Sequence, residues 1–227
     1  MRRRAPKGWS LLHGLFVTGT DTAVGKTVVA AALLLRYRSL RYWKPIQTGT
    51  AVDDDTGTVE ALTRLDRTRF LDRGIRLSAP VSPHMAAARE GRRLTLEPLL
   101  ELAASQRHQT RWIVEGAGGA LVPINESVLM VDLMKQLGLP VLVVARTTLG
   151  TINHTLLTLE ALRARSVVVA GVVMTGAPNA DNRASIETYG GTRVIGELPH
   201  LDPLGPSTLA AHANQVDPEA RLASLLQ

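Results

Sequence analysis

Short apolar stretches alternate with longer amphipathic segments along the chain. The apolar stretches are rich in Val, Leu and Ile and are followed by Gly, Thr or Pro. Such stretches are typical of buried β-strands, whereas apolar positions that recur every three or four residues are typical of helices. Strands are predicted at residues 14–17, 40–43, 112–114, 139–144, 167–174 and 193–195. Helices are predicted at residues 25–37, 58–65, 96–107, 128–137, 152–163 and 182–188, with a short one near 218–226.

This alternation predicts an α/β fold. Strand–helix–strand units join parallel strands by right-handed crossovers, so we expect a mostly parallel sheet with helices on both faces, in a single domain over residues 1–227. Residues 1–10 are expected to be a flexible basic N-terminus, and residues 68–80 show neither pattern. Parallel sheets bind ligands beyond the carboxyl ends of their strands. The segments expected to converge there are 18–27, 44–50, 115–119, 146–150 and 175–178.

The composition narrows the class of protein. None of the 227 residues is a cysteine, which excludes disulfides and thiolate metal sites and favours a cytoplasmic protein. No apolar stretch approaches the roughly 18 residues that a membrane span needs. A net charge of +6 would suit nucleic-acid binding, but the arginines are scattered and only residues 2–4 form a run. We therefore expect neither a membrane nor a nucleic-acid partner.

The segment G-T-D-T-A-V-G-K-T, residues 19–27, matches a phosphate-binding loop. The usual loop reads G-x-x-x-x-G-K-[ST], and here one more residue separates the two glycines. The segment joins a predicted strand to a predicted helix, whose free N–H groups and dipole attract an anion. Lys26 is expected at the β and γ phosphates, and the Thr27 hydroxyl on Mg²⁺. The predicted nucleotide-binding residues here are Gly19, Thr20, Asp21, Thr22, Ala23, Val24, Gly25, Lys26, Thr27 and Val28.

Two further positions draw attention for their chemistry. Of the 26 cationic residues only four are lysines, and two of these, Lys26 and Lys44, follow predicted strands, where a compact ammonium group suits an anion. Glu115 follows the predicted strand 112–114, where an acidic ligand of Mg²⁺ is expected. The glycines after Glu115 allow the backbone to approach a ligand closely.

Several motifs in the same order resemble the dethiobiotin synthetase family. They are F-V-T-G-T-D-T-A-V-G-K-T at 16–27, K-P-I-Q-T-G at 44–49, the acidic cluster at 53–55, S-P-H at 82–84, V-E-G-A-G-G at 114–119, L-G-T-I-N-H at 149–154 and G-E-L-P at 196–199. The resemblance implies a phosphate-loop ATPase fold. It also implies a reaction in which 7,8-diaminononanoate, CO₂ and ATP give dethiobiotin, ADP and phosphate, through a carbamate that is phosphorylated and then attacked by the second amine. Mg²⁺ and a homodimer, whose partner subunit completes the substrate site, are implied as well.

The resemblance assigns roles to individual residues. It implies catalytic roles for Lys26, Lys44, Thr22 and Thr48, and nucleotide binding by Glu115, Gly116, Gly118, Gly119, Thr175, Glu197, Leu198 and Pro199. Substrate binding is implied for Thr22, Lys44, Thr48, Gly150, Thr151, Ile152 and Asn153. The implied Mg²⁺ ligands are Thr27, Asp55 and Glu115, with Asp53 or Asp54 as alternatives to Asp55. His84 and His154 receive no role in proton transfer.

Two positions depart from the family pattern, and two other functions stay open. Ala23 stands where a glutamate is frequent, and Thr175 stands where the family can carry an Asn that reads the base. Because Thr offers one hydroxyl where Asn offers a paired donor and acceptor, the sequence leaves the nucleotide base open.

One alternative function is an amide ligase of the cobyric acid synthase type, although the cysteine of its glutamine-handling domain is missing here. The other is a DNA-associated, nucleotide-switched ATPase, although the extra lysine of the partition ATPase loop is also missing.

Overall fold

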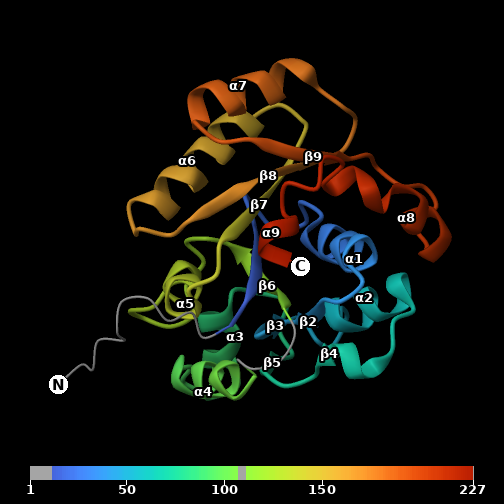
Figure 1. The fold of residues 1–227 in the computed structure, drawn as a ribbon. Coiled ribbons are helices and arrows are strands. Elements are labelled where there is room, and N and C mark those ends of the chain that lie inside the picture. Colours follow the sequence, from blue (N-terminus) through green and yellow to red (C-terminus); the bar gives the residue numbers. More distant parts are fainter. Residues whose placement is uncertain (1–11, 107–110, 227) are drawn as a thin grey trace.

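A seven-stranded sheet, parallel throughout, forms the centre of the molecule (Figure 1). The computed structural model describes residues 12–106 and 111–226. The strand order is β4-β2-β6-β1-β7-β8-β9. The strands are β1 (Gly14–Gly19), β2 (Arg41–Trp43), β4 (Phe70–Leu71), β6 (Trp112–Gly119), β7 (Val141–Arg146), β8 (Val169–Thr175) and β9 (Val194–Leu198). A separate parallel pair consists of β3 (Ile46–Thr48) and β5 (Ile75–Leu77).

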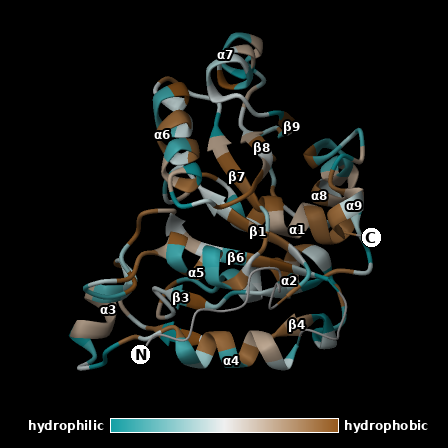
Figure 2. Ribbon diagram, turned by 60° about the vertical axis from the view of Figure 1, so that its left-hand side comes forward, coloured by the Kyte–Doolittle hydropathy of each residue, from teal (hydrophilic) through white to brown (hydrophobic). Residues whose placement is uncertain are grey.

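Helices cover both faces of the sheet, so that each central strand is buried on two sides. One face carries α1 (Lys26–Arg36), α2 (Asp55–Thr63), α8 (Pro206–His212) and α9 (Ala223–Leu226). The other carries α3 (Pro83–Arg89), α4 (Glu97–Ser105), α5 (Met130–Leu137), α6 (Thr151–Arg163) and α7 (Ala180–Gly190). Two short 3₁₀ helices are η1 (Arg67–Arg69) and η2 (Ala213–Val216). The near-continuous Val and Leu runs of the strands follow from this double burial, and Figure 2 shows these strands as hydrophobic.

The strand register brings the chemically interesting residues to one edge of the sheet. In β1 and β6, Val17 pairs with Glu115, and the phosphate-binding loop follows where β1 ends. In β2 and β6, Trp43 pairs with Val114, so Lys44 leaves β2 next to Glu115. Side chains on one strand alternate between faces, and Tyr42 packs with Ile113 in the core beneath α1 and α2.

The predicted parallel α/β fold is confirmed, with corrections to several elements. All six predicted strands occur, but the short strands β3, β4 and β5, of two or three residues each, were missed. Helices α3 and α8 were missed, and of the predicted helix 218–226 only α9 is helical. Helix α2 begins at Asp55 rather than at residue 58, because the Asp54 carboxylate caps it by accepting from the Thr56 N–H at 3.2 Å. Glu115 lies inside β6, not after it.

Three further predictions concern a membrane span, the N-terminal segment and the end of α4. Within residues 12–106 and 111–226, no helix is long and apolar enough to cross a membrane. The predicted flexible segment 1–10 lies outside the described residues. The predicted helix 96–107 is α4, and its last residue also lies outside them.

Candidate active site

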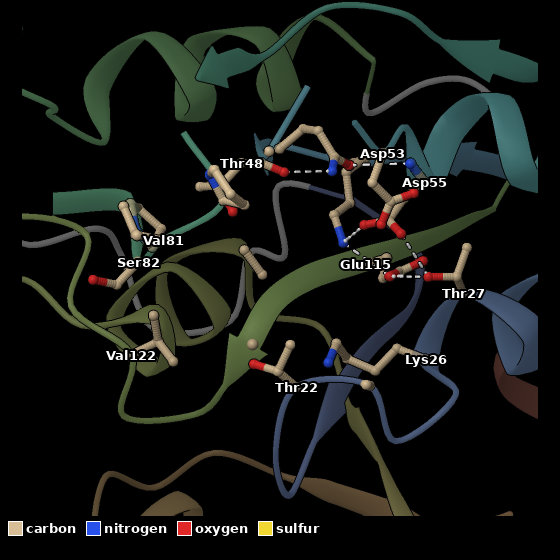
Figure 3. Close-up of a pocket in the computed structure, with 18 of the residues that line it drawn as sticks. Thr22, Lys26, Thr27, Thr48, Asp53, Asp55, Val81, Ser82, Glu115 and Val122 are labelled. Atoms are coloured by element: carbon tan, nitrogen blue, oxygen red, sulfur yellow. Dashed lines mark hydrogen bonds and ion pairs between the residues drawn. The ribbon is translucent and has the colours of Figure 1, made fainter. Parts of the chain in front are cut away.

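A cavity of about 630 Å³ opens at the carboxyl ends of β1, β2 and β6 (Figure 3). Figure 3 shows Thr27, Asp55 and Glu115 at one end of it and Val81, Ser82 and Val122 at the other. The sequence-predicted residues that line it are Thr22, Ala23, Gly25, Lys26, Thr27, Val28, Lys44, Thr48, Asp53, Asp55, Glu115 and Gly118. Three of the five segments expected to converge, 18–27, 44–50 and 115–119, therefore do so.

The phosphate-binding loop owes its shape to its two glycines. Gly25 has a φ of 89° and immediately precedes α1. Because glycine has no side chain, it cannot cap the first N–H groups of α1. A Cβ on Gly19 would lie 2.7 Å from the Asp21 carbonyl oxygen and 3.1 Å from the Lys26 Nζ. A side chain at either glycine would therefore distort the loop. An uncapped helix start in this position suits an anion such as a phosphate.

Lys26 bends back over the loop rather than toward solvent. Its side chain is buried, and its Nζ donates to the Asp21 carbonyl oxygen at 3.0 Å. Burial and the nearby Lys44 ammonium lower the pKa of Lys26, and Glu115 and Asp55 only partly offset them. An anion bound at the loop would raise the pKa of Lys26 again, because it would favour the charged ammonium.

Four side chains form a polar cluster beside the loop: Lys44 and Glu115, which are buried, and Thr27 and Asp55, which are partly buried. The Lys44 Nζ lies 2.5 Å from Asp55 Oδ2 and 2.8 Å from Glu115 Oε1. The Thr27 hydroxyl is 2.8 Å from Asp55 Oδ1 and 3.0 Å from Glu115 Oε1. Lys44 is thus a buried and paired ammonium group, not an exposed surface charge.

The charges in this cluster stabilise one another. Burial alone would lower the pKa of Lys44, but the Glu115 and Asp55 carboxylates outweigh it and raise that pKa. Burial would raise the pKa of Asp55, but the Lys44 ammonium and the Thr27 hydroxyl outweigh it and lower that pKa. The Lys44 ammonium and the Asp55 carboxylate are therefore both charged at neutral pH.

The neighbouring aspartates behave differently from Asp55. Asp54 caps α2 and forms an exposed ion pair with Arg76 at 2.9 Å. Asp53 lines the cavity but is exposed. Of the three candidates, only Asp55 contacts Thr27 and Lys44. The donor set of one hydroxyl and two carboxylates fits the preference of Mg²⁺ for oxygen ligands.

The residues predicted on the β7 to β9 side of the loop lie outside this cavity. The Thr175 hydroxyl donates to the Val24 carbonyl oxygen at 2.8 Å, and Glu197 accepts from Arg183 at 3.0 Å. Gly150 immediately precedes α6 and has a φ of 92°. The sequence-predicted residues that do not line the cavity are Gly19, Thr20, Asp21, Val24, Gly116, Gly119, Gly150, Thr151, Ile152, Asn153, Thr175, Glu197, Leu198 and Pro199.

Comparisons with known proteins identify the family. Residues 13–208 match the AAA domain family. The chain is 49% identical to the ATP-dependent dethiobiotin synthetase BioD of Paramagnetospirillum magneticum, across 88% of this chain and 94% of that protein. It is 43% identical to the enzyme of the same name from Rhizorhabdus wittichii, across 88% and 94%. This chain belongs to the dethiobiotin synthetase family. It is also 50% identical to the biotin biosynthesis bifunctional protein BioCD of Bordetella avium, of which it covers 41%.

Solved structures share the fold of this family member at low sequence identity. The ParA family ATPase of Chlorobium tepidum has a TM-score of 0.57 at 13% identity, covering 96% of this chain and 97% of that one. The MinC:MinD cell division complex of Aquifex aeolicus has a TM-score of 0.53 at 13% identity, covering 89% and 94%. These likenesses show the phosphate-loop fold alone, so they add nothing in favour of a DNA-associated ATPase.

Three features of this dethiobiotin synthetase family member were missed at the sequence level. The Tyr42 hydroxyl donates to Glu115 Oε2 at 2.9 Å. Burial, together with the Glu115 carboxylate, raises the pKa of Tyr42 well above its usual range. The Gln47 Oε1 accepts from the Asp55 N–H at 3.3 Å. The Arg146 guanidinium pairs with Asp21 at 2.9 Å. Only Tyr42 had a usable signal, since it stands two residues before Lys44 at the end of a predicted strand and so faces the same side.

Proposed function

We propose that the protein is an ATP-dependent dethiobiotin synthetase of biotin biosynthesis, which closes a cyclic urea from 7,8-diaminononanoate and CO₂. The observation that carries this proposal is the position of two buried ammonium groups, on Lys26 and Lys44, at one cavity that opens at a phosphate-binding loop. The reaction must hold two anions, a triphosphate and a carbamate, close together. Two ammonium groups in a site of low dielectric offset the repulsion between these anions.

The chemistry has three steps. One amine of the substrate adds to CO₂ and loses a proton, which gives a carbamate. A carbamate oxygen attacks the γ-phosphorus and displaces ADP, and the second amine then attacks the carbamate carbon, loses a proton and expels phosphate. Lys26 would contact the β and γ oxygens, and Lys44 the carbamate and the γ oxygens. Thr22 and Thr48, which both line the cavity, would donate to the same oxygens.

We propose that Thr27, Asp55 and Glu115 hold a Mg²⁺ ion. One carboxylate oxygen of Asp55 and one of Glu115 lie within hydrogen-bond distance of the Thr27 hydroxyl, which supports this assignment. When bound, Mg²⁺ would supply positive charge to the β and γ phosphate oxygens. The fold would set the position of the ion, because Asp55 begins α2 and Glu115 lies in a central strand of the sheet.

The wall opposite the ion cluster suits the aliphatic part of the substrate. Val81 and Val122 lie there (Figure 3), and Val52, Pro80 and Pro83 also line the cavity with apolar surface. A diamine with a hydrocarbon tail would bury that tail here, while its amines face Lys44 and Thr48. Ala23, which lines the same cavity, offers no carboxylate to the amines.

We further propose that a homodimer completes the substrate site and that the enzyme is cytoplasmic. Residues 150–153 lie outside the cavity of their own chain, so a second copy would have to present that helix start to the substrate carboxylate. A second cavity of about 380 Å³ beside the loop, lined by the exposed Leu121 and Leu157, offers an apolar contact. Sedimentation of the protein and of Leu157→Asp, with Tyr189→Asp on α7 as control, tests the dimer. A monomeric unaltered protein would contradict it, and activity in the membrane fraction of cells would contradict the location.

The function is tested by the substrates that ATP cleavage requires. We expect ADP release from ATP only when diaminononanoate and bicarbonate are both present, with one dethiobiotin formed per ADP by mass spectrometry. Mixtures that lack one substrate serve as controls. Equal ADP release without the diamine would contradict the proposal. Repeating the assay with GTP, CTP and UTP measures the base preference that Thr175 leaves open.

A further inference from the structure

Glu115 is held from two directions, and only one of them belongs to the site described above. Its Oε1 atom accepts from Lys44 at 2.8 Å and from Thr27 at 3.0 Å, both of which line the cavity. Its Oε2 atom accepts from the Tyr42 hydroxyl at 2.9 Å. Tyr42 does not line the cavity and is fully buried. The carboxylate therefore has one oxygen on the ligand side and one on the protein side.

The backbone delivers both contacts from a single strand. Tyr42 lies in β2, two residues before Lys44, and alternation along the strand directs both side chains to the same face. The neighbouring strand β6 pairs with β2 in register and carries Glu115 on that face. The Tyr42 ring packs edge-on against Phe70, with 6.1 Å between ring centroids, so that the hydroxyl has little freedom to move.

We propose that Tyr42 is a positioning residue, whose hydroxyl fixes the rotation of the Glu115 carboxylate so that Oε1 faces Thr27 and Lys44. This rests on the proposed function, because it assigns Glu115 to the metal and phosphate site. A carboxylate has two equivalent oxygens and a terminal torsion with a broad minimum, so a single donor on one oxygen decides where the other points. Outer contacts of this kind commonly set the affinity of an inner ligand for its ion.

The chain contains a matched control for this bond. Tyr37 is also buried and donates to a buried carboxylate, Asp217 Oδ2, at 2.5 Å. Tyr37 follows the C-terminal end of α1, whereas the phosphate-binding loop precedes the N-terminal end of that helix. Asp217 also accepts from the N–H groups of Arg221 and Leu222, and none of these residues lines the cavity. Tyr37→Phe therefore removes the same kind of hydrogen bond away from the site.

The experiment compares Tyr42→Phe with Tyr37→Phe by calorimetric titration of ADP at a series of Mg²⁺ concentrations. Phe retains the ring and its packing in both variants. We expect Tyr42→Phe to raise the Mg²⁺ concentration needed for half-maximal ADP binding by about tenfold, as outer-contact variants do. We expect Tyr37→Phe to leave it within about twofold. In turnover, Tyr42→Phe should raise the Mg²⁺ requirement more than it lowers kcat at saturating Mg²⁺.

Each outcome decides the matter. A Tyr42→Phe protein whose Mg²⁺ dependence stays within about twofold of the unaltered one would overturn the inference. So would equal shifts in the two variants, or a Tyr42→Phe protein that fails to fold while Tyr37→Phe folds, since the bond would then serve stability rather than the site. Binding of ADP needs no turnover, so a failure of the diamine-dependent reaction is seen separately from a failure here.

Discussion

The two flanks of the phosphate-binding loop are built on different principles. On the flank of β2 and β6, four buried or partly buried polar side chains contact one another and line the cavity. On the flank of β7 and β8, polar side chains bind the protein itself: Thr175 holds the loop at Val24, and Arg146 holds it at Asp21. One flank presents charge to a ligand, and the other fixes the shape of the loop that receives it.

The largest effects should come from the two lysines of the first flank. We expect Lys26→Ala and Lys44→Ala each to lower kcat by about 10²–10³, as removal of a charge-stabilising donor does elsewhere. Lys135, an exposed lysine on α5, provides the control, and Lys135→Ala should keep full activity. Steady-state ADP release with the diamine present measures this.

The lysine variants should differ in stability. Lys44→Ala leaves two carboxylates without their counter-charge, which costs about 3–5 kcal/mol for a buried pair. Lys26→Ala removes an ammonium that burial already disfavours, so its urea midpoint should change little. Equal loss of stability in both variants would contradict the structural difference between the two lysines. Normal activity in either variant would contradict its catalytic role.

A smaller effect is expected when neighbouring aspartates are compared. Asp55→Ala should raise the Mg²⁺ requirement about tenfold or more, because it removes a proposed ligand. Asp54→Ala removes the cap of α2, which should cost about 0.5–2 kcal/mol of stability and leave the Mg²⁺ requirement unchanged. Titration of activity with Mg²⁺ and thermal unfolding separate the two. If Asp54→Ala shifted the Mg²⁺ curve as far as Asp55→Ala, the choice of Asp55 would be wrong.

The smallest effect concerns the second flank. Thr175→Val keeps the shape of the side chain but loses its hydrogen bond to the loop, worth about 0.5–1.5 kcal/mol. The KM values for ATP, GTP and CTP should therefore rise together, by roughly 2- to 10-fold, and Thr175→Ser should retain most of the affinity. A change confined to one nucleotide would show that Thr175 reads the base instead.

The sequence predicted the first flank far better than the second. Lys26 and Thr27 have fixed places in a motif that a strand and a helix enclose. Lys44 and Glu115 were each expected just beyond a predicted parallel strand, and in the structure Lys44 follows β2 beside Glu115 in the neighbouring strand β6. Asp55 came from the family resemblance, and its contact with Thr27 depends on how the Asp54 cap begins α2. Alternation along the predicted strand places Tyr42 on the same face as Lys44. Its bond to Glu115, like that of Gln47 to Asp55, could not be predicted, because each depends on a side-chain direction inside the packed core.

Prediction fell short on the second flank for a physical reason. Placing residues 146–150 and 175–178 at the carboxyl ends of β7 and β8 was right, but a sheet edge is wider than one cavity. The hydroxyl of Thr175 donates to the carbonyl oxygen of Val24 in the loop rather than facing the cavity. If residues 150–153 bind substrate, they would do so in a second copy, which the sequence of one chain does not describe geometrically.

The most direct measurement is a crystal structure with a non-hydrolysable ATP analogue, Mg²⁺ and the diamine in bicarbonate. We expect phosphates at the N–H groups that begin α1, a cation contacting Thr27, Asp55 and Glu115, and the carbamate oxygens within hydrogen-bond distance of the Lys44 ammonium. A nucleotide bound at the loop with Lys44 and Glu115 turned away from it, or bound at another place in the molecule, would contradict the account.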